Sequence, residues 1–185
     1  MKKVLVLDFG GQYNLLVARR VRECGVYCEI KSYRLSMADI RAFGPDALIL
    51  TGGPATVFEE GAPMVDPAIF ELGVPVLGIC YGLQLMIHLL GGQCRRAETR
   101  EYGKVELTHN GKSPLFKDIP ATAVYWMSHG VEVETLAPGF EVVASTDGCR
   151  CAAIQCAEKQ LYGVQFHPEV LHTQYGKELL QNFLY

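Results

Sequence analysis

Short apolar runs alternate with helical patterns through the first half of the chain, and this alternation limits the possible folds more than any other feature. The runs cover residues 4–7, 26–30, 47–50 and 74–79. They are apolar at most positions and not only at every second one, as expected for strands buried on both faces of a parallel sheet. The β-α-β-α order favours the same arrangement. We therefore predict an α/β fold with an open, mostly parallel central sheet and helices on both faces.

The second half of the chain has a different pattern, with short strands separated by turns. Across the whole chain, helices are expected at residues 12–24, 36–43, 64–72, 83–90 and 174–184. The later strands are expected at residues 104–108, 124–127, 131–135, 141–145, 152–156 and 161–166. They predict a small mixed or antiparallel β extension of the parallel sheet. Because no repeat, low-complexity tract or linker interrupts the sequence, residues 1–185 are predicted to form a single domain.

Composition excludes several classes of protein. Charged residues make up 20% of the 185 residues and the net charge is −3, so no nucleic acid is expected as a partner. No apolar stretch approaches the roughly 20 residues that a membrane span needs, so no membrane association is expected. The apolar run at residues 4–7 is too short for a secretory signal, which predicts a cytoplasmic protein. The seven cysteines are odd in number and lack paired C-x2-C spacing, so we expect reduced thiols and no metal site.

One of these cysteines, Cys80, lies where the fourth predicted strand meets a helix, in the sequence Gly78-Ile79-Cys80-Tyr81-Gly82. The pattern G-x-C-x-G is the cysteine counterpart of the serine nucleophile elbow. Such an elbow is a strained turn that exposes the nucleophile above the carboxyl ends of the strands, at a helix N-terminus that favours the thiolate. The alternative is a buried structural cysteine between glycines that serve packing.

A base and its partner follow the last apolar strand, in Gln165-Phe166-His167-Pro168-Glu169. His167 and Glu169 are two residues apart, so an extended backbone projects both to one side. The carboxylate can then hold one imidazole nitrogen while the other faces a nucleophile such as Cys80. The alternative for His167 is a partly buried histidine that the backbone satisfies. Of the other histidines, His129 and His172 lie near motifs, and their roles stay open at this point.

Thr51-Gly52-Gly53-Pro54 follows the third strand, and glycine lets backbone N–H groups approach a ligand closely. This suits an oxyanion hole formed by the N–H groups of Gly53 and of Tyr81, the residue after the nucleophile. A phosphate cradle would be a competing use, but the segment lacks the established phosphate-binding patterns. An ordinary turn is the simplest alternative.

Together these motifs resemble the class I, triad-type glutamine amidotransferases, and the resemblance covers nearly the whole chain. Within the class, the sequence is most similar to the glutaminase part of the GMP synthases. Beyond the motifs above, the resemblance rests on Asp8-Phe9-Gly10-Gly11-Gln12-Tyr13, Val17-Ala18-Arg19-Arg20-Val21-Arg22-Glu23, Trp126-Met127-Ser128-His129-Gly130, and Gly163-Val164-Gln165-Phe166-His167-Pro168-Glu169-Val170 with His172-Thr173.

The resemblance implies a flavodoxin-like fold and a set of roles for single residues. Cys80 is the nucleophile, His167 the general base and acid, and Glu169 its orienting carboxylate. Gln84 would help to hold the substrate glutamine. The amino-acid end of glutamine would contact backbone groups of Ser128, His129, Gly130 and Val131.

The resemblance also implies a partner. In the family, the released ammonia is used by an ATP-dependent synthetase that converts xanthosine monophosphate to GMP. The sequence has no Ser-Gly-Gly-x-Asp-Ser pyrophosphatase loop and no Walker motif. The expected partners are therefore glutamine and an ATP-pyrophosphatase synthetase domain or subunit, with ATP and magnesium needed only there and no cofactor here. The chain is either a stand-alone subunit or an excised N-terminal domain.

Two alternatives remain open from the sequence. One is a different cysteine hydrolase on the same scaffold, such as the glutaminase of another class I amidotransferase or a γ-glutamyl peptidase. The other is a non-catalytic or regulatory module with an amidotransferase fold, although such a module should have lost one of Cys80, His167 and Glu169.

Overall fold

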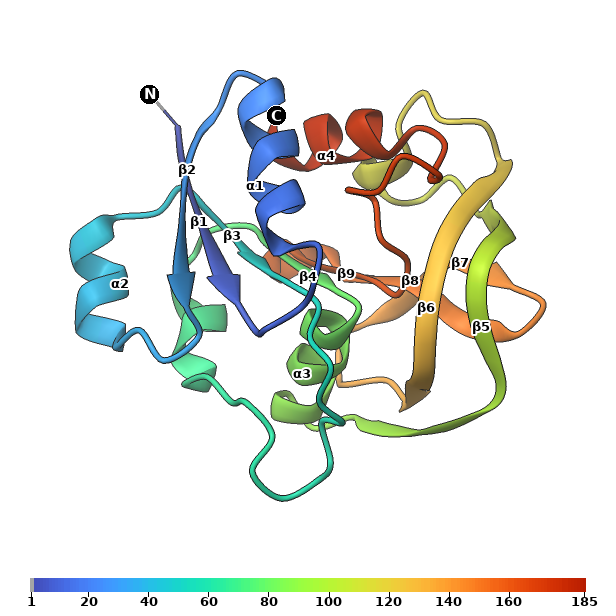
Figure 1. Ribbon diagram of the computed structural model, residues 1–185, viewed down its shortest axis with the longest axis horizontal. Helices are drawn as coiled ribbons and strands as arrows, with labels where there is room; N and C mark the ends of the chain where they lie inside the picture. The colour runs from blue at the N-terminus through green and yellow to red at the C-terminus, as the bar shows by residue number, and fades with distance from the viewer. Residues whose placement is uncertain (1) are drawn as a thin grey trace.

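The computed structural model describes residues 2–185, and its strands join into one continuous sheet (Figure 1). The strands are β1 (Lys3–Asp8), β2 (Tyr27–Ser32), β3 (Ala47–Leu50), β4 (Val76–Ile79), β5 (Gln93–His109), β6 (Thr122–Thr135), β7 (Glu141–Thr146), β8 (Cys149–Cys156) and β9 (Leu161–Val164). The helices are α1 (Asn14–Glu23), α2 (Met37–Phe43), α3 (Tyr81–Leu89) and α4 (Gly176–Leu184), with 3-10 turns η1 (Pro67–Glu71), η2 (Pro114–Phe116) and η3 (Ala157–Lys159).

The first half of the sheet is parallel, as the apolar runs predict. Strands β2, β1, β3, β4 and β9 lie side by side in this order, and every pairing among them is parallel. Alternate side chains of β1 enter two different cores: Val4 and Val6 pack with residues of α1 and α4, whereas Leu5 and Leu7 pack with residues of α2 and α3. Helices therefore cover both faces of the parallel part (Figure 1).

The second half of the sheet is the predicted antiparallel extension. The order continues from β9 through β8, β7 and β5 to β6, and each of these pairings is antiparallel. Strands β5 and β6 form a long ribbon that joins β7 through only two residue pairs, Thr108 with Ser145 and His109 with Ala144. The parallel part of the sheet thus contains the strands after which the sequence motifs lie, and the long β5–β6 ribbon extends beside it. Within residues 2–185, no helix is both long and apolar enough to cross a membrane.

The helix predicted at residues 64–72 is wrong. The structure has only the short 3-10 turn η1 there. Pro67 disfavours helical backbone at the residue before it, and Asp66 is extended, with a side chain that accepts a hydrogen bond from the N–H of Ala68. Helical backbone therefore begins only at Pro67, and it forms no more than the short 3-10 turn η1.

The predicted turn between two strands at residues 124–135 is also wrong. The structure has one strand, β6, that runs through Ser128, His129 and Gly130 without a turn. It pairs with β5, whose first half at residues 93–103 was not expected to be a strand. That half is mostly polar or charged and mostly exposed, so it lacks the apolar pattern by which a strand is recognised.

Candidate active site

Cys80 occupies a strained turn between β4 and α3, as the elbow motif predicts. Its φ is 53° and its ψ is −105°, which is a sparsely populated region for a residue other than glycine. The flanking glycines are required by space: a Cβ on Gly78 would lie 2.6 Å from the carbonyl carbon of Gly82, and one on Gly82 would collide with the backbone of Leu50. Cys80 is the N-cap of α3, so the helix N-terminus faces the sulfur.

His167 and Glu169 form a buried pair just beyond β9. The His167 Nδ1 lies 2.7 Å from the Glu169 Oε1, and both residues are buried. The backbone around them is fixed by three further contacts: the His167 N–H donates to the Trp126 carbonyl, Thr173 Oγ1 donates to the His167 carbonyl, and Arg20 Nε donates to the Glu169 carbonyl. The carboxylate holds Nδ1, so Nε2 is the ring nitrogen left for another partner.

Cys80 and His167 come together because their strands are neighbours. Strands β4 and β9 are paired in parallel, with Ile79 opposite Val164, so the segments that follow both strands leave the same edge of the sheet. Burial alone would lower the pKa of His167, but hydrogen bonds to Cys80 and Glu169 outweigh it and raise the pKa to about 10. The raised pKa makes this imidazole a stronger base toward the neighbouring thiol.

Two cavities meet at Cys80. The first, about 330 Å³, contains Cys80, His167 and Glu169 and is also lined by residues 10–14. The second, about 320 Å³, also contains Cys80 but extends toward β5 and β6. The two cavities share Gly53, Pro54, Cys80 and Ser128.

The expected oxyanion and substrate residues line the second cavity. Its wall includes Gly53, Tyr81, Gln84, Ser128, His129, Gly130 and Val131. The backbone N–H groups of Gly53 and Tyr81 donate to no other residue within 2–185, so both are free for a ligand. Gly53 has no room for a side chain, because a Cβ there would lie 2.5 Å from the Phe9 carbonyl oxygen. The structure therefore brings every predicted site residue to the sulfur or to a cavity that the sulfur borders.

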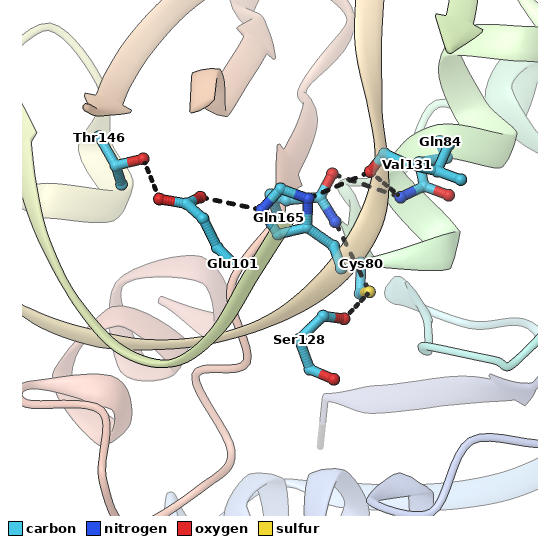
Figure 2. A network of polar contacts seen from close by, with 8 residues as sticks. Cys80, Gln84, Glu101, Ser128, Val131, Thr146 and Gln165 are labelled. Atoms are coloured by element: carbon cyan, nitrogen blue, oxygen red, sulfur yellow. Dashed lines mark hydrogen bonds and ion pairs between the residues drawn. The ribbon is translucent and has the colours of Figure 1, made fainter. Parts of the chain in front are cut away.

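Sequence reasoning gave no role to Gln165, which is fully buried beside the sulfur. Its Nε2 lies 3.6 Å from the Cys80 Sγ, and its Oε1 lies 3.4 Å from the Nε2 of Gln84 (Figure 2). Gln84 in turn donates to the Val131 carbonyl at 3.0 Å. Gln165 belongs to the motif with His167, but only the tertiary structure reveals its contact with Cys80.

The second cavity also has cationic residues that sequence reasoning missed. These are Arg96 and Arg100 of β5, which line it together with Tyr102 of the same strand. Arg96 pairs with Glu59 at 2.7 Å, whereas Arg100 pairs with no carboxylate within residues 2–185. The Nε of Arg100 lies close over Gly130, since a Cβ on Gly130 would be 3.6 Å from it. An unpaired guanidinium at this position suits the carboxylate of an amino acid.

Within residues 2–185, one group of side chains has ligand atoms close enough for a metal ion: those of Glu101, His129 and Cys149 lie within 4.8 Å of one another. The Glu101 carboxylate already contacts His129 Nε2 at 2.9 Å. It also accepts from the Thr146 hydroxyl at 2.8 Å (Figure 2). Burial raises the pKa of Cys149 well above its ordinary value, and Glu101 adds to the shift. The Glu101 contact fixes His129, whose other ring nitrogen lies 3.2 Å from the Val131 carbonyl.

The strained turn at Cys80, the His167–Glu169 pair and the amide-lined cavity are features expected of a cysteine amidotransferase, and comparison with known proteins agrees. The chain belongs to the class I glutamine amidotransferases, whose family model matches residues 5–185. The structure of a glutamine amidotransferase from Thermotoga maritima has the same fold, with a TM-score of 0.74 at 18% identity over 99% of this chain and 96% of that one.

More similar relatives are glutamine-hydrolysing GMP synthases. Those of Lachnospira eligens and Caldicellulosiruptor saccharolyticus are each 56% identical to this chain, in alignments that cover 99% and 98% of it respectively. The chain spans only 35% and 36% of the lengths of these two relatives. The crystal structure of a candidate GMP synthase subunit from Thermoplasma acidophilum has a TM-score of 0.91 at 31% identity and covers 100% of this chain and 92% of that one.

Proposed function

We propose that this chain hydrolyses glutamine to glutamate and ammonia through a thioester on Cys80. The observation that carries this proposal is that Cys80 and the His167–Glu169 pair lie at the carboxyl ends of adjacent parallel strands and open onto a common cavity. A thiol next to a buried, oriented imidazole is suited to nucleophilic attack on an acyl carbon. The family to which the chain belongs performs this chemistry on glutamine.

In the proposed reaction, His167 Nε2 takes the thiol proton and the Cys80 thiolate attacks the carboxamide carbon of glutamine. The negative oxygen that forms accepts hydrogen bonds from the N–H groups of Gly53 and Tyr81. His167 returns its proton to the departing nitrogen, ammonia leaves and a γ-glutamyl thioester remains. His167 then takes a proton from water, and the resulting hydroxide releases glutamate and restores the thiol.

The substrate occupies the second cavity in this proposal. Gln84 and the backbone of Ser128–Val131 hold the amino-acid end of glutamine, and the guanidinium of Arg100 lies where it can pair with the α-carboxylate. These groups lie on α3, β5 and β6, so the cavity joins the parallel part of the sheet to the β5–β6 ribbon. No step of this chemistry requires a metal ion or organic cofactor in this chain.

The ammonia is proposed to serve an ATP-dependent synthetase that aminates xanthosine monophosphate to GMP, with ATP and magnesium bound by that partner. The support is the 56% identity to GMP synthases of which the chain spans about a third. A cytoplasmic location is part of this proposal, and the seven free cysteines support a reducing compartment.

The test is a glutamate-release assay with and without the synthetase, ATP and xanthosine monophosphate. We expect weak glutaminase activity alone, a higher rate with the complete mixture, and no activity for Cys80→Ala. Turnover of γ-glutamyl peptides but not of glutamine would instead assign a peptidase. If an electrophilic glutamine analogue fails to label Cys80 even in the presence of the synthetase, the chain is a non-catalytic module.

A further inference from the structure

The side-chain amides of Gln84 and Gln165 form a chain of hydrogen bonds whose direction is fixed at one end. The Val131 carbonyl oxygen can only accept, so the group of Gln84 that faces it at 3.0 Å must be the NH2 group. The same NH2 group faces Gln165 at 3.4 Å, and the atom of Gln165 that it meets must therefore be the oxygen. This leaves the NH2 group of Gln165 directed at the Cys80 sulfur, 3.6 Å away (Figure 2).

The sulfur has two polar contacts of opposite kind besides the imidazole. The Ser128 carbonyl oxygen, 3.7 Å from Sγ, can only accept, so this contact requires a protonated thiol. The Gln165 amide can donate, so its contact is strengthened when the sulfur becomes an anion. When Sγ gives its proton to His167 Nε2, the contact with the Ser128 carbonyl therefore becomes unfavourable and the contact with the Gln165 amide becomes favourable.

We propose that Gln165 is a catalytic residue that donates an amide hydrogen to the Cys80 sulfur and stabilises its thiolate. Gln84 acts on the same atom through Gln165, as a positioning residue, in addition to its expected contact with substrate. Gln165 is fully buried, so water does not compete for this hydrogen bond. The inference rests on the proposed function only in naming glutamine as the molecule that the thiolate attacks.

The test compares Gln165→Met with Gln155→Met, a matched change at a second buried glutamine. Gln155 is also nearly fully buried, but its side-chain amide donates a hydrogen bond to Glu141 at 2.9 Å. In the sheet it lies at the level of Leu77, since both pair with Tyr162, and not at the level of Cys80. The rate of iodoacetamide alkylation is measured across pH 5–9 on the peptide that contains Cys80, by mass spectrometry. This readout reports the ionisation of the thiol and needs no substrate.

Loss of the donor should move the apparent midpoint of Cys80 alkylation upward by about one pH unit in Gln165→Met, because a hydrogen bond to a charged group is removed. Gln155→Met should keep the wild-type midpoint. The kcat/KM for glutamine at neutral pH should fall about tenfold in Gln165→Met, in step with the lower thiolate fraction. A structural role alone would change stability without moving the alkylation midpoint.

A wild-type midpoint in folded Gln165→Met, checked by circular dichroism, overturns the proposal. If that variant does not fold, Gln165→Glu keeps the shape of the side chain and replaces the donor by a carboxylate, which should raise the midpoint further; an unchanged midpoint there also overturns it. A protein whose wild type does not hydrolyse glutamine, but whose Gln165 variants still shift the midpoint, would refute the proposed function and leave this inference standing.

Discussion

Gly78 and Gly82 touch backbone to backbone across the elbow that carries Cys80. A Cβ atom on Gly78 would lie 2.6 Å from the carbonyl carbon of Gly82, and neither neighbour can move without displacing β4 or α3. The two glycines thereby let the helix begin immediately beyond the strand. This contact determines how far the sulfur stands above the edge of the sheet.

Gly78→Ala should therefore destabilise the protein by about 3 kcal/mol or more, because an extra methyl group meets main-chain atoms that cannot give way. Gly61→Ala provides the comparison, since Gly61 has a positive φ of 81° but open space around it, and strain there costs only about 1–2 kcal/mol. Urea unfolding monitored by tryptophan fluorescence measures both. Equal losses in the two variants would contradict the packing explanation.

Cys80→Gly should be more stable than Cys80→Ala by about 1 kcal/mol, the reverse of the usual order. The backbone at φ 53° and ψ −105° is strained for any side chain, and glycine removes that strain. Both variants lack the nucleophile and should be inactive. Thermal unfolding of the two at one pH decides the order, and a more stable alanine variant would show that the turn is not strained.

The unfolding free energy should decrease as the pH rises from about 6.5 to 8.5. The pKa of His167 is raised to about 10, so over this interval the folded protein keeps a proton that the unfolded chain has released. The stabilisation is complete below pH 6.5 and is lost through pH 10, with a slope of at most about 1.4 kcal/mol per pH unit. Denaturant titrations across this range measure the slope.

Cys80→Ala is the control for this pH dependence, because it removes one of the hydrogen bonds that raise the pKa of His167. Its slope should be smaller than that of the wild type. Buried thiols such as Cys24 and Cys28, whose pKa burial raises, contribute a similar loss only at higher pH, which is why the interval ends at about 8.5. Identical slopes in wild type and variant would show that Cys80 does not influence His167.

Arg100→Ala should raise the KM for glutamine about tenfold while changing kcat little, because it removes the cavity-lining cation that we propose pairs with the α-carboxylate. Arg100→Lys should recover part of the affinity. Arg96→Ala is the matched variant on the same strand and should have a smaller effect, since Glu59 already holds that guanidinium. A fall in kcat alone would place Arg100 in the chemical steps and not in binding.

The parallel part of the sheet and the meeting of Cys80, His167 and Glu169 at its edge were predictable from the sequence because both depend on local patterns. A buried parallel strand is apolar along its length, and the positions of Cys80 and His167 follow from the strands that end just before them. The spacing of His167 and Glu169 correctly predicted that the two side chains would meet. Each of these inferences needed only a few consecutive residues.

The β5–β6 ribbon and the support of the site could not be predicted in the same way. The first half of β5 is exposed and charged, so its strand structure comes from pairing with β6 and leaves no apolar pattern. Ser128–Gly130 has the composition of a turn but is extended because β5 lies beside it. Contacts such as Gln165 with Cys80 and Glu101 with His129 join residues 85 and 28 positions apart, and nothing in either segment specifies its partner.

The position of the Cys80 sulfur between two cavities affects the routes by which substrates and products reach and leave it. A glutamyl group attached from the side of Gln84 would fill one chamber, while the chamber on the side of His167 would stay open to the other face of the thioester. The departing ammonia and the incoming water could then use a different opening from the one through which the amino acid passes. Turnover would not have to wait for glutamate to clear the entrance before ammonia moves on.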